Sequence, residues 1–129
     1  MSIGDHMEEE AFMKKISRED LKPFELAPGI TANVITSDTM TIMHARLKAG
    51  ASAPEHSHVQ EQIVNVIEGE IELTVEGKPH HLKLGDTLIL PPNVLPLAKA
   101  ITDCHVLDVF CPVREDLASG NFSGYPEKN

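Results

Sequence analysis

Short apolar runs separated by turn signals dominate the chain from Gly29 onward. In the run 70–75, Ile71, Leu73 and Val75 share one face of a predicted strand, and the polar residues between them share the other. Turn-forming residues separate such runs at Ser37-Asp38, Ala49-Gly50, Glu68-Gly69, Glu76-Gly77, Leu84-Gly85 and Pro91-Pro92-Asn93. About eight or more strands in roughly 90 residues predict an all-β domain, whose strands close into a barrel or stack as a sandwich to cover their edges and apolar faces.

The two ends of the chain do not follow this pattern. Residues 1–23 are expected to be an N-terminal extension, in which Ser17 and two acidic residues after it predict a short helical turn. Residues 24–116 are expected to form the β-barrel, and the polar tail 117–129 a loose coil. The first residues show neither a basic region nor the apolar run of an export signal, so we expect a cytoplasmic protein.

The composition limits the class of protein. The 129 residues, of which 41% are hydrophobic, fit one domain, and no apolar run approaches the roughly 20 residues that span a bilayer. A formal charge of -9 opposes binding to nucleic acid or to an anionic membrane surface. Cys104 and Cys111 are predicted to point to opposite faces of one strand, so we expect no disulfide, which fits a reduced cytoplasm.

The residues with the most distinctive chemistry lie between Gly50 and Gly69. On an extended strand His56 and His58 project to the same face, and Gln62 keeps that parity four residues later. Two imidazoles and one amide oxygen can then converge on a divalent metal ion. The alternative is that both histidines are ordinary surface or core residues.

The spacing of glycines, histidines and Gln62 in this segment resembles the first motif of the cupin superfamily. A second stretch, which begins at Gly85-Asp86, resembles the opening of the second cupin motif. The resemblance covers about residues 24–116 and implies the cupin jelly-roll barrel, a double-stranded β-helix. Two departures are evident: Gln62 stands where the family usually has Glu, and Pro96 stands where the second motif should end in a metal-binding His.

These departures leave the cofactor open. His56, His58 and Gln62 would hold a divalent ion such as nickel, zinc, manganese or iron more weakly than a four-ligand site does. The neutral amide would leave the ion more positive charge with which to polarise a substrate oxygen. The alternative is a pocket that binds its ligand without metal.

Two other histidines are expected to lie outside the pocket. His44 shares its strand parity with Arg46, so its side chain is predicted to face outward. His105 has the parity opposite to that of Asp108. Neither therefore replaces the ligand that is missing at Pro96.

A third segment, 102–116, resembles the end of the barrel in the small pectin-degradation cupins, which convert 4,5-unsaturated uronates into open-chain keto sugars. The resemblance implies that Asp108, Phe110 and Arg114 line the pocket. Asp108 would carry the proton between oxygen and carbon, with a pKa raised by its setting. Phe110 would pack on the sugar, and Arg114 would bind its carboxylate with a bidentate fork. The alternative is structural: an ion pair for Asp108, a core position for Phe110 and a capped turn for Arg114.

Three functions follow as hypotheses. The first is a sugar-acid tautomerase or isomerase that acts on an unsaturated uronate, and the second is a non-catalytic cupin that binds a small molecule. The third is a metal-dependent dioxygenase, which Pro96 disfavours because such sites generally use three histidines. We also expect a homodimer, because the strand edges and the apolar residues Phe24, Leu26 and Ile30 need cover.

Overall fold

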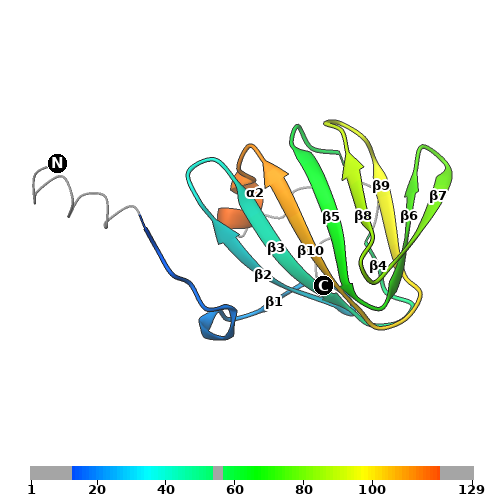
Figure 1. Ribbon diagram of the computed structural model, residues 1–129, viewed down its shortest axis with the longest axis horizontal. Helices are drawn as coiled ribbons and strands as arrows, with labels where there is room; N and C mark the ends of the chain where they lie inside the picture. Colours follow the sequence, from blue (N-terminus) through cyan, green and yellow to red (C-terminus); the bar gives the residue numbers. More distant parts are fainter. Residues whose placement is uncertain (1–12, 54–56, 120–129) are drawn as a thin grey trace, which may run out of the picture.

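The computed structural model describes residues 13–53 and 57–119, which form a sandwich of two antiparallel sheets (Figure 1). The first sheet contains, in spatial order, β1 (Phe24–Ala27), β2 (Ile30–Thr36), β3 (Thr41–Leu47), β10 (Cys104–Cys111), β5 (Glu61–Glu68) and β8 (Thr87–Leu90). The second contains β4 (Ser52–Ala53), β9 (Pro96–Ala100), β6 (Glu70–Val75) and β7 (Lys78–Lys83). The predicted all-β fold is confirmed.

Alternation along the strands directs apolar side chains into the space between the two sheets. On β6, Ile71 and Leu73 are 2% and 4% exposed, whereas Glu70 and Glu72 keep more contact with solvent. The same alternation holds on β3, where every second residue is buried. Burial of each large apolar side chain stabilises the fold by about 1.5–3 kcal/mol, so the core between the sheets is the main source of stability.

Strand β10 occupies a central position in the first sheet. It is the last strand in the chain, yet it lies between β3 and β5. Its register places Asp108 beside Met43 on one side and Val64 on the other. A polar side chain on the inner face of such a strand is far from either sheet edge, so it must find partners or a ligand inside the sandwich.

The turn between β5 and β6 explains the glycine that ends the first motif. Gly69 has a φ of 79°, in the left-handed region that favours glycine. A Cβ atom at this position would lie 2.1 Å from the carbonyl oxygen of Asp103 and 2.8 Å from Cβ of Cys104. Both the backbone conformation and the close approach to the start of β10 therefore require glycine.

Short helical turns precede and follow the strands. Arg18–Asp20 forms the 3-10 turn η1, as predicted, although the Ser17 side chain makes no capping hydrogen bond and its carbonyl oxygen accepts from the Asp20 N–H at 3.0 Å. Helix α2 (Glu115–Ser119) follows β10. Its Leu117 is 3% exposed and belongs to the core, so packing continues beyond residue 116, where the sequence predicted the barrel to end.

The two cysteines are both free, as predicted. Cys104 is buried, and burial raises the pKa of its thiol to about 11, whereas Cys111 is exposed. Within the described part of the chain, none of the helices has the length and apolar character needed to cross a membrane.

Candidate functional site

Asp108 is a carboxylic acid enclosed in the sandwich. It projects from the inner face of β10 and is 6% exposed. Its Oδ1 atom has no hydrogen-bond partner among the described residues. Burial raises the pKa of this carboxyl from 3.8 to about 7, against the opposing effects of Gln62 and Arg114. The predicted rise in pKa is confirmed, and the group is suited to accept and return a proton near neutral pH.

Gln62 links Asp108 to His58. Hydrogen bonding from the Gln62 amide lowers the pKa of Asp108, so the NH₂ group faces the carboxyl and the amide oxygen points elsewhere. That oxygen, Oε1, lies 3.2 Å from Nε2 of His58. The other ring nitrogen of His58, Nδ1, lies 3.1 Å from the carbonyl oxygen of Gln60. The three side chains therefore form one polar chain.

In one tautomer of His58 these contacts direct two lone pairs toward each other. Where Nδ1 donates to the Gln60 carbonyl, which only accepts, Nε2 is an acceptor in the neutral ring. Oε1 of Gln62 is also an acceptor, and two acceptors 3.2 Å apart need a cation or a proton beside them. The separation is close to that between neighbouring ligands held about 2.1 Å from one ion. The donor set of His58 and Gln62 therefore fits a divalent metal.

The way in which His58 and Gln62 meet differs from the prediction. His58 lies in the loop between β4 and β5, and only Gln62 lies on a strand. The loop is held because the Asn93 N–H donates to the His58 carbonyl at 2.9 Å. His56, the third predicted ligand, lies outside the described residues. Within the described residues, no group of three or more His, Cys, Asp or Glu side chains is placed to hold a metal ion.

Pro96 occupies the position at which the family resemblance implies a further ligand. It is buried at the start of β9 and lines, together with Gln62 and Asp108, a cavity of about 60 Å³ inside the sandwich. Gln62 and Asp108 are the polar side chains of the described lining, and the remaining lining is apolar. The proline ring contributes no donor atom, so its part of the cavity wall cannot bind a metal ion.

Arg114 is buried beside Phe110 and is held at several of its atoms. The residue is 1% exposed, its Nε donates to Oδ1 of Asp116 at 3.0 Å, and its Nη2 pairs with Oδ2 of the same carboxylate. Its backbone N–H donates to Oγ1 of Thr41 at 3.0 Å. Nη1 has no hydrogen-bond partner among the described residues. An unsatisfied N–H on a buried cation is costly, and a bound anion would remove that cost.

Phe110 and Arg114 both contact other residues of the site. Phe110 is 1% exposed and belongs to the core. Its ring meets His58 edge-on at 5.4 Å and lies 4.8 Å from the guanidinium carbon of Arg114, so it supports two site residues. Its packing on a sugar stays a prediction. The expected two-nitrogen fork of Arg114 is already occupied by Asp116, which leaves Nη1 for a ligand.

His44 and His105 lie outside this site, as strand parity predicted. Both project from the outer face of the first sheet, where Nδ1 of His44 lies 2.9 Å from Nε2 of His105 and 3.1 Å from Nη1 of Arg18. With Arg18 packed against the pair, His105 is 3% exposed despite its position on the outer face. Burial, followed by nearby arginines, lowers the pKa of both imidazoles.

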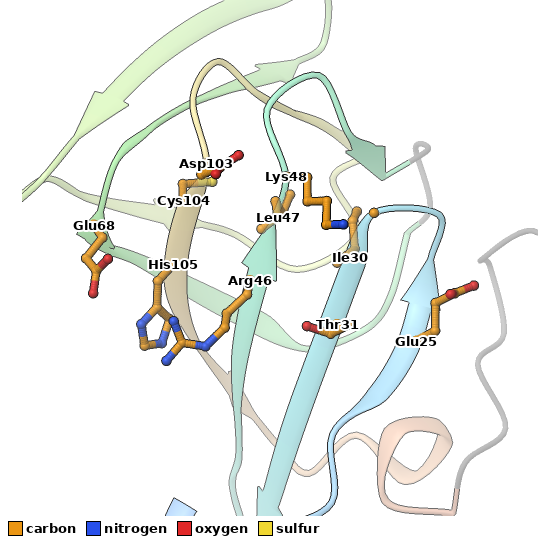
Figure 2. Close-up of a pocket in the computed structure, with 11 residues that line it drawn as sticks. Glu25, Ile30, Thr31, Arg46, Leu47, Lys48, Glu68, Asp103, Cys104 and His105 are labelled. Atoms are coloured by element: carbon orange, nitrogen blue, oxygen red, sulfur yellow. The ribbon is translucent and has the colours of Figure 1, made fainter. Parts of the chain in front are cut away.

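A larger hollow of about 460 Å³ surrounds the start of β10 on the outside (Figure 2). Its lining mixes the cations Arg46 and Lys48 with the anions Glu68 and Asp103, and Figure 2 shows the Arg46 guanidinium beside the His105 ring. No predicted site residue belongs to the described lining of this hollow. We therefore take the interior cavity as the candidate site, because the buried Asp108 carboxyl lines it and the buried Arg114 is near enough to lower the pKa of that carboxyl.

Three residues that support the site were not predicted from the sequence. Gln60 is 9% exposed, and its side chain donates at 3.0 Å to a backbone carbonyl just before Arg114, so it ties the β4–β5 loop to that segment. Thr41 and Asp116 hold the backbone and the side chain of Arg114. Only Asp116 gave a signal in the sequence, because an acidic residue two positions after an arginine can form an ion pair with it. The contacts of Gln60 and Thr41 join distant parts of the chain, so the sequence did not indicate them.

Comparison with known proteins identifies the family. Residues 43–110 match the family model described as Cupin domain. Pectin degradation protein KdgF from Dickeya dadantii (strain 3937) is 32% identical over 108 residues, which cover 81% of this chain and 98% of that protein. Two solved structures match with a TM-score of 0.76 and 25% identity over 81% of this chain: an RmlC-like cupin from Shewanella frigidimarina NCIMB 400, covered to 96%, and KdgF from Halomonas sp., covered to 98%. The predicted cupin fold is confirmed, and the chain belongs to the cupin family.

Proposed function

We propose that the interior site binds a 4,5-unsaturated uronate and catalyses its ring opening and ketonisation. The similarity to a protein named for pectin degradation, over most of both chains, supports this assignment. One structural observation carries it: the buried Asp108, with a pKa of about 7, lies near the buried Arg114, whose Nη1 is unpaired among the described residues. An unsaturated uronate offers a carboxylate to Arg114 and a proton to Asp108.

The reaction moves one proton from oxygen to carbon. Asp108 in its basic form accepts the proton of the hydroxyl on C1, a carbonyl forms at C1, and the bond between C1 and the ring oxygen breaks. The ring oxygen stays on C5 as an enolate. Protonated Asp108 then delivers the proton to C4, and the enolate becomes a ketone. No atom or electron is gained or lost, so a single acid with a pKa near neutrality is sufficient.

Arg114 would orient the sugar acid. Because Nε and Nη2 are held by Asp116, Nη1 would make one charge-assisted hydrogen bond to the substrate carboxylate, worth about 1.5–3 kcal/mol. That carboxylate is attached to C5, so the contact also places C4 relative to Asp108. The cavity of about 60 Å³ is smaller than a sugar ring, so only the reacting edge of the substrate would enter it.

The residues that would hold a divalent ion are His58 and Gln62, with His56 as the third predicted ligand. When bound, the ion would supply positive charge that stabilises an oxyanion on the substrate. The Gln60 carbonyl would favour the His58 tautomer in which Nε2 carries a lone pair for the ion. Nickel, zinc, manganese and iron are the candidate ions.

Turnover of a 4,5-unsaturated galacturonate tests the proposal. Ketonisation removes the ultraviolet absorbance of the double bond, and the spontaneous rate is measured without protein. We expect the protein-dependent rate to fall about a hundredfold or more in Asp108→Asn, as for loss of a general acid–base group. Asp38→Asn, at an exposed carboxyl between β2 and β3, is the matched control and should keep its rate. No acceleration by the folded wild-type protein, with or without added metal, would contradict the proposal.

A non-catalytic binding cupin is the second candidate. The observation that favours it is Pro96, which removes a donor from the cavity wall beside Gln62. Calorimetric binding of the same sugar acid without turnover would support this function over catalysis. A dioxygenase ranks third, because Pro96 stands where its third histidine is expected. A cytoplasmic location stays a prediction.

A further inference from the structure

Two buried polar side chains beside the interior site have no part in the proposed chemistry. Among the described residues, the buried polar side chains are Thr41, Gln60, His105, Asp108 and Arg114. His105 lies on the outer face, and Asp108 and Arg114 are the proposed acid and anion contact. Thr41 is 0% and Gln60 9% exposed, yet neither lines the interior cavity. Burial of a polar group costs free energy unless the group is paired, so the partners of these two side chains indicate what they do.

Both side chains bond the peptide unit that joins Val113 to Arg114. The side-chain amide of Gln60 donates to the Val113 carbonyl oxygen at 3.0 Å. The Arg114 N–H donates to Oγ1 of Thr41, also at 3.0 Å. This carbonyl and this N–H belong to one planar group, and they point in opposite directions because the bond between them is trans. Gln60 and Thr41 therefore hold the same peptide plane from opposite sides.

The sheet order brings the two residues to this peptide unit. Strand β10 lies between β3 and β5 (Figure 1); Thr41 is the first residue of β3, and Gln60 directly precedes β5. Pairing of β10 ends at Phe110 with β3 and at Cys111 with β5. Pro112, which follows, has no N–H to donate. Beyond the end of the strand ladder, two side chains therefore supply the pairing that the neighbouring strands supply along β10.

We propose that Gln60 and Thr41 are positioning residues that aim Nη1 of Arg114 at the substrate carboxylate. This role rests on the proposed binding of a uronate by Arg114. Fixing the peptide plane before Arg114 restricts the direction in which its side chain leaves the backbone, and Asp116 holds Nε and Nη2 at the other end. With both ends of the residue held, the direction of Nη1 is set, and this atom has no hydrogen-bond partner among the described residues. The substrate carboxylate then meets a donor that is already oriented.

Substitutions of similar shape remove the two bonds one at a time. Gln60→Met keeps the length of the side chain without its N–H, and Thr41→Val keeps the shape without the hydroxyl. We expect either change to raise KM for a 4,5-unsaturated galacturonate about three- to tenfold, as for loss of one hydrogen bond, with a smaller effect on kcat. Thr41→Ser keeps the hydroxyl and should restore the wild-type KM. Thr87→Val, which removes an exposed hydroxyl bonded to Asn65 at 2.9 Å, is the matched control and should also keep it.

A double-mutant cycle with Arg114→Lys separates positioning from general support of the fold. If Gln60 and Thr41 act through Arg114, adding either substitution to Arg114→Lys should raise KM no further, because lysine lacks the nitrogen that they aim. Two side chains that only stabilise the fold would act independently of Arg114, and their effects on KM would multiply. Circular dichroism establishes that each variant is folded. Wild-type KM in both single variants, or multiplied effects in folded double variants, would overturn the proposal.

The Nε–H group of Arg114 gives a test that needs no turnover. It is buried and donates to Asp116 at 3.0 Å, so its NMR signal should exchange slowly with water, and loss of the signal in Arg114→Lys assigns it. In Gln60→Met and Thr41→Val we expect the signal to shift and its exchange to accelerate about tenfold or more, with no change in Thr41→Ser or Thr87→Val. An unchanged signal in both folded variants would overturn the positioning role. A changed signal in a protein without turnover would support that role and contradict the uronate assignment alone.

Discussion

Replacing Asp108 with asparagine should make the protein more stable above neutral pH and remove its activity. The carboxyl is 6% exposed, and its pKa is about 7 in the folded protein against an ordinary value of 3.8. Asparagine has nearly the same shape but cannot ionise. The substitution therefore removes the free-energy cost of holding a charge inside the sandwich, together with the group that moves the proton.

The two pKa values set the magnitude and the pH range of this effect. The difference of about three pKa units corresponds to about 4 kcal/mol as an upper limit. Because the folded state holds this proton more tightly than the unfolded state, ionisation lowers the free energy of unfolding as pH rises from about 4 to about 7. Above about pH 7 the folded protein bears the full free-energy cost of the ionised Asp108 carboxylate. The variant lacks this contribution, so its advantage should be near zero at about pH 4 and largest near pH 8.

Urea unfolding of metal-free protein at several pH values measures the effect. The wild type and Asp108→Asn should have similar midpoints at low pH and diverge with rising pH, while the exposed control Asp38→Asn should follow the wild type within about 0.5 kcal/mol. Equal stability of wild type and Asp108→Asn at pH 8 would refute the buried-charge reasoning. Greater stability with unchanged turnover would show instead that Asp108 is buried at a cost but does not move the proton.

Three further predictions concern the anion contact, the metal ligands and the outer-face histidines. Arg114→Lys should raise KM for the uronate about tenfold with a smaller effect on kcat, because lysine cannot hold Asp116 and a substrate together. Initial rates over a range of substrate concentrations give both constants. Pro96→His should tighten nickel or zinc binding by about one to three orders of magnitude in calorimetry, and unchanged affinity would show that residue 96 is not at the ligand position. The pKa values of His44 and His105 are lowered in the folded protein, so the unfolded chain takes up protons first and the free energy of unfolding should fall below about pH 6.5. Changing both histidines to glutamine should reduce this fall, which urea unfolding at several pH values measures.

Alternation along strands made much of the fold and part of the site predictable. The side chains of Asp108 and Phe110 point inward and that of His105 outward because a strand has a period of two, and the same rule separates Cys104 from Cys111. The raised pKa of Asp108 followed from placing a carboxyl on an apolar inner face. These features depend on local geometry, which the sequence specifies directly.

Contacts between distant segments were not predictable in the same way. The fork of Arg114 is occupied by Asp116 in helix α2, and this helix packs against β2, which lies far earlier in the chain. His105 is buried on an outer face because Arg18, 87 positions earlier in the chain, packs against it. His58 reaches Gln62 from a loop, where strand parity does not apply. Each of these contacts depends on the path of a connecting segment, and composition or periodicity does not determine that path.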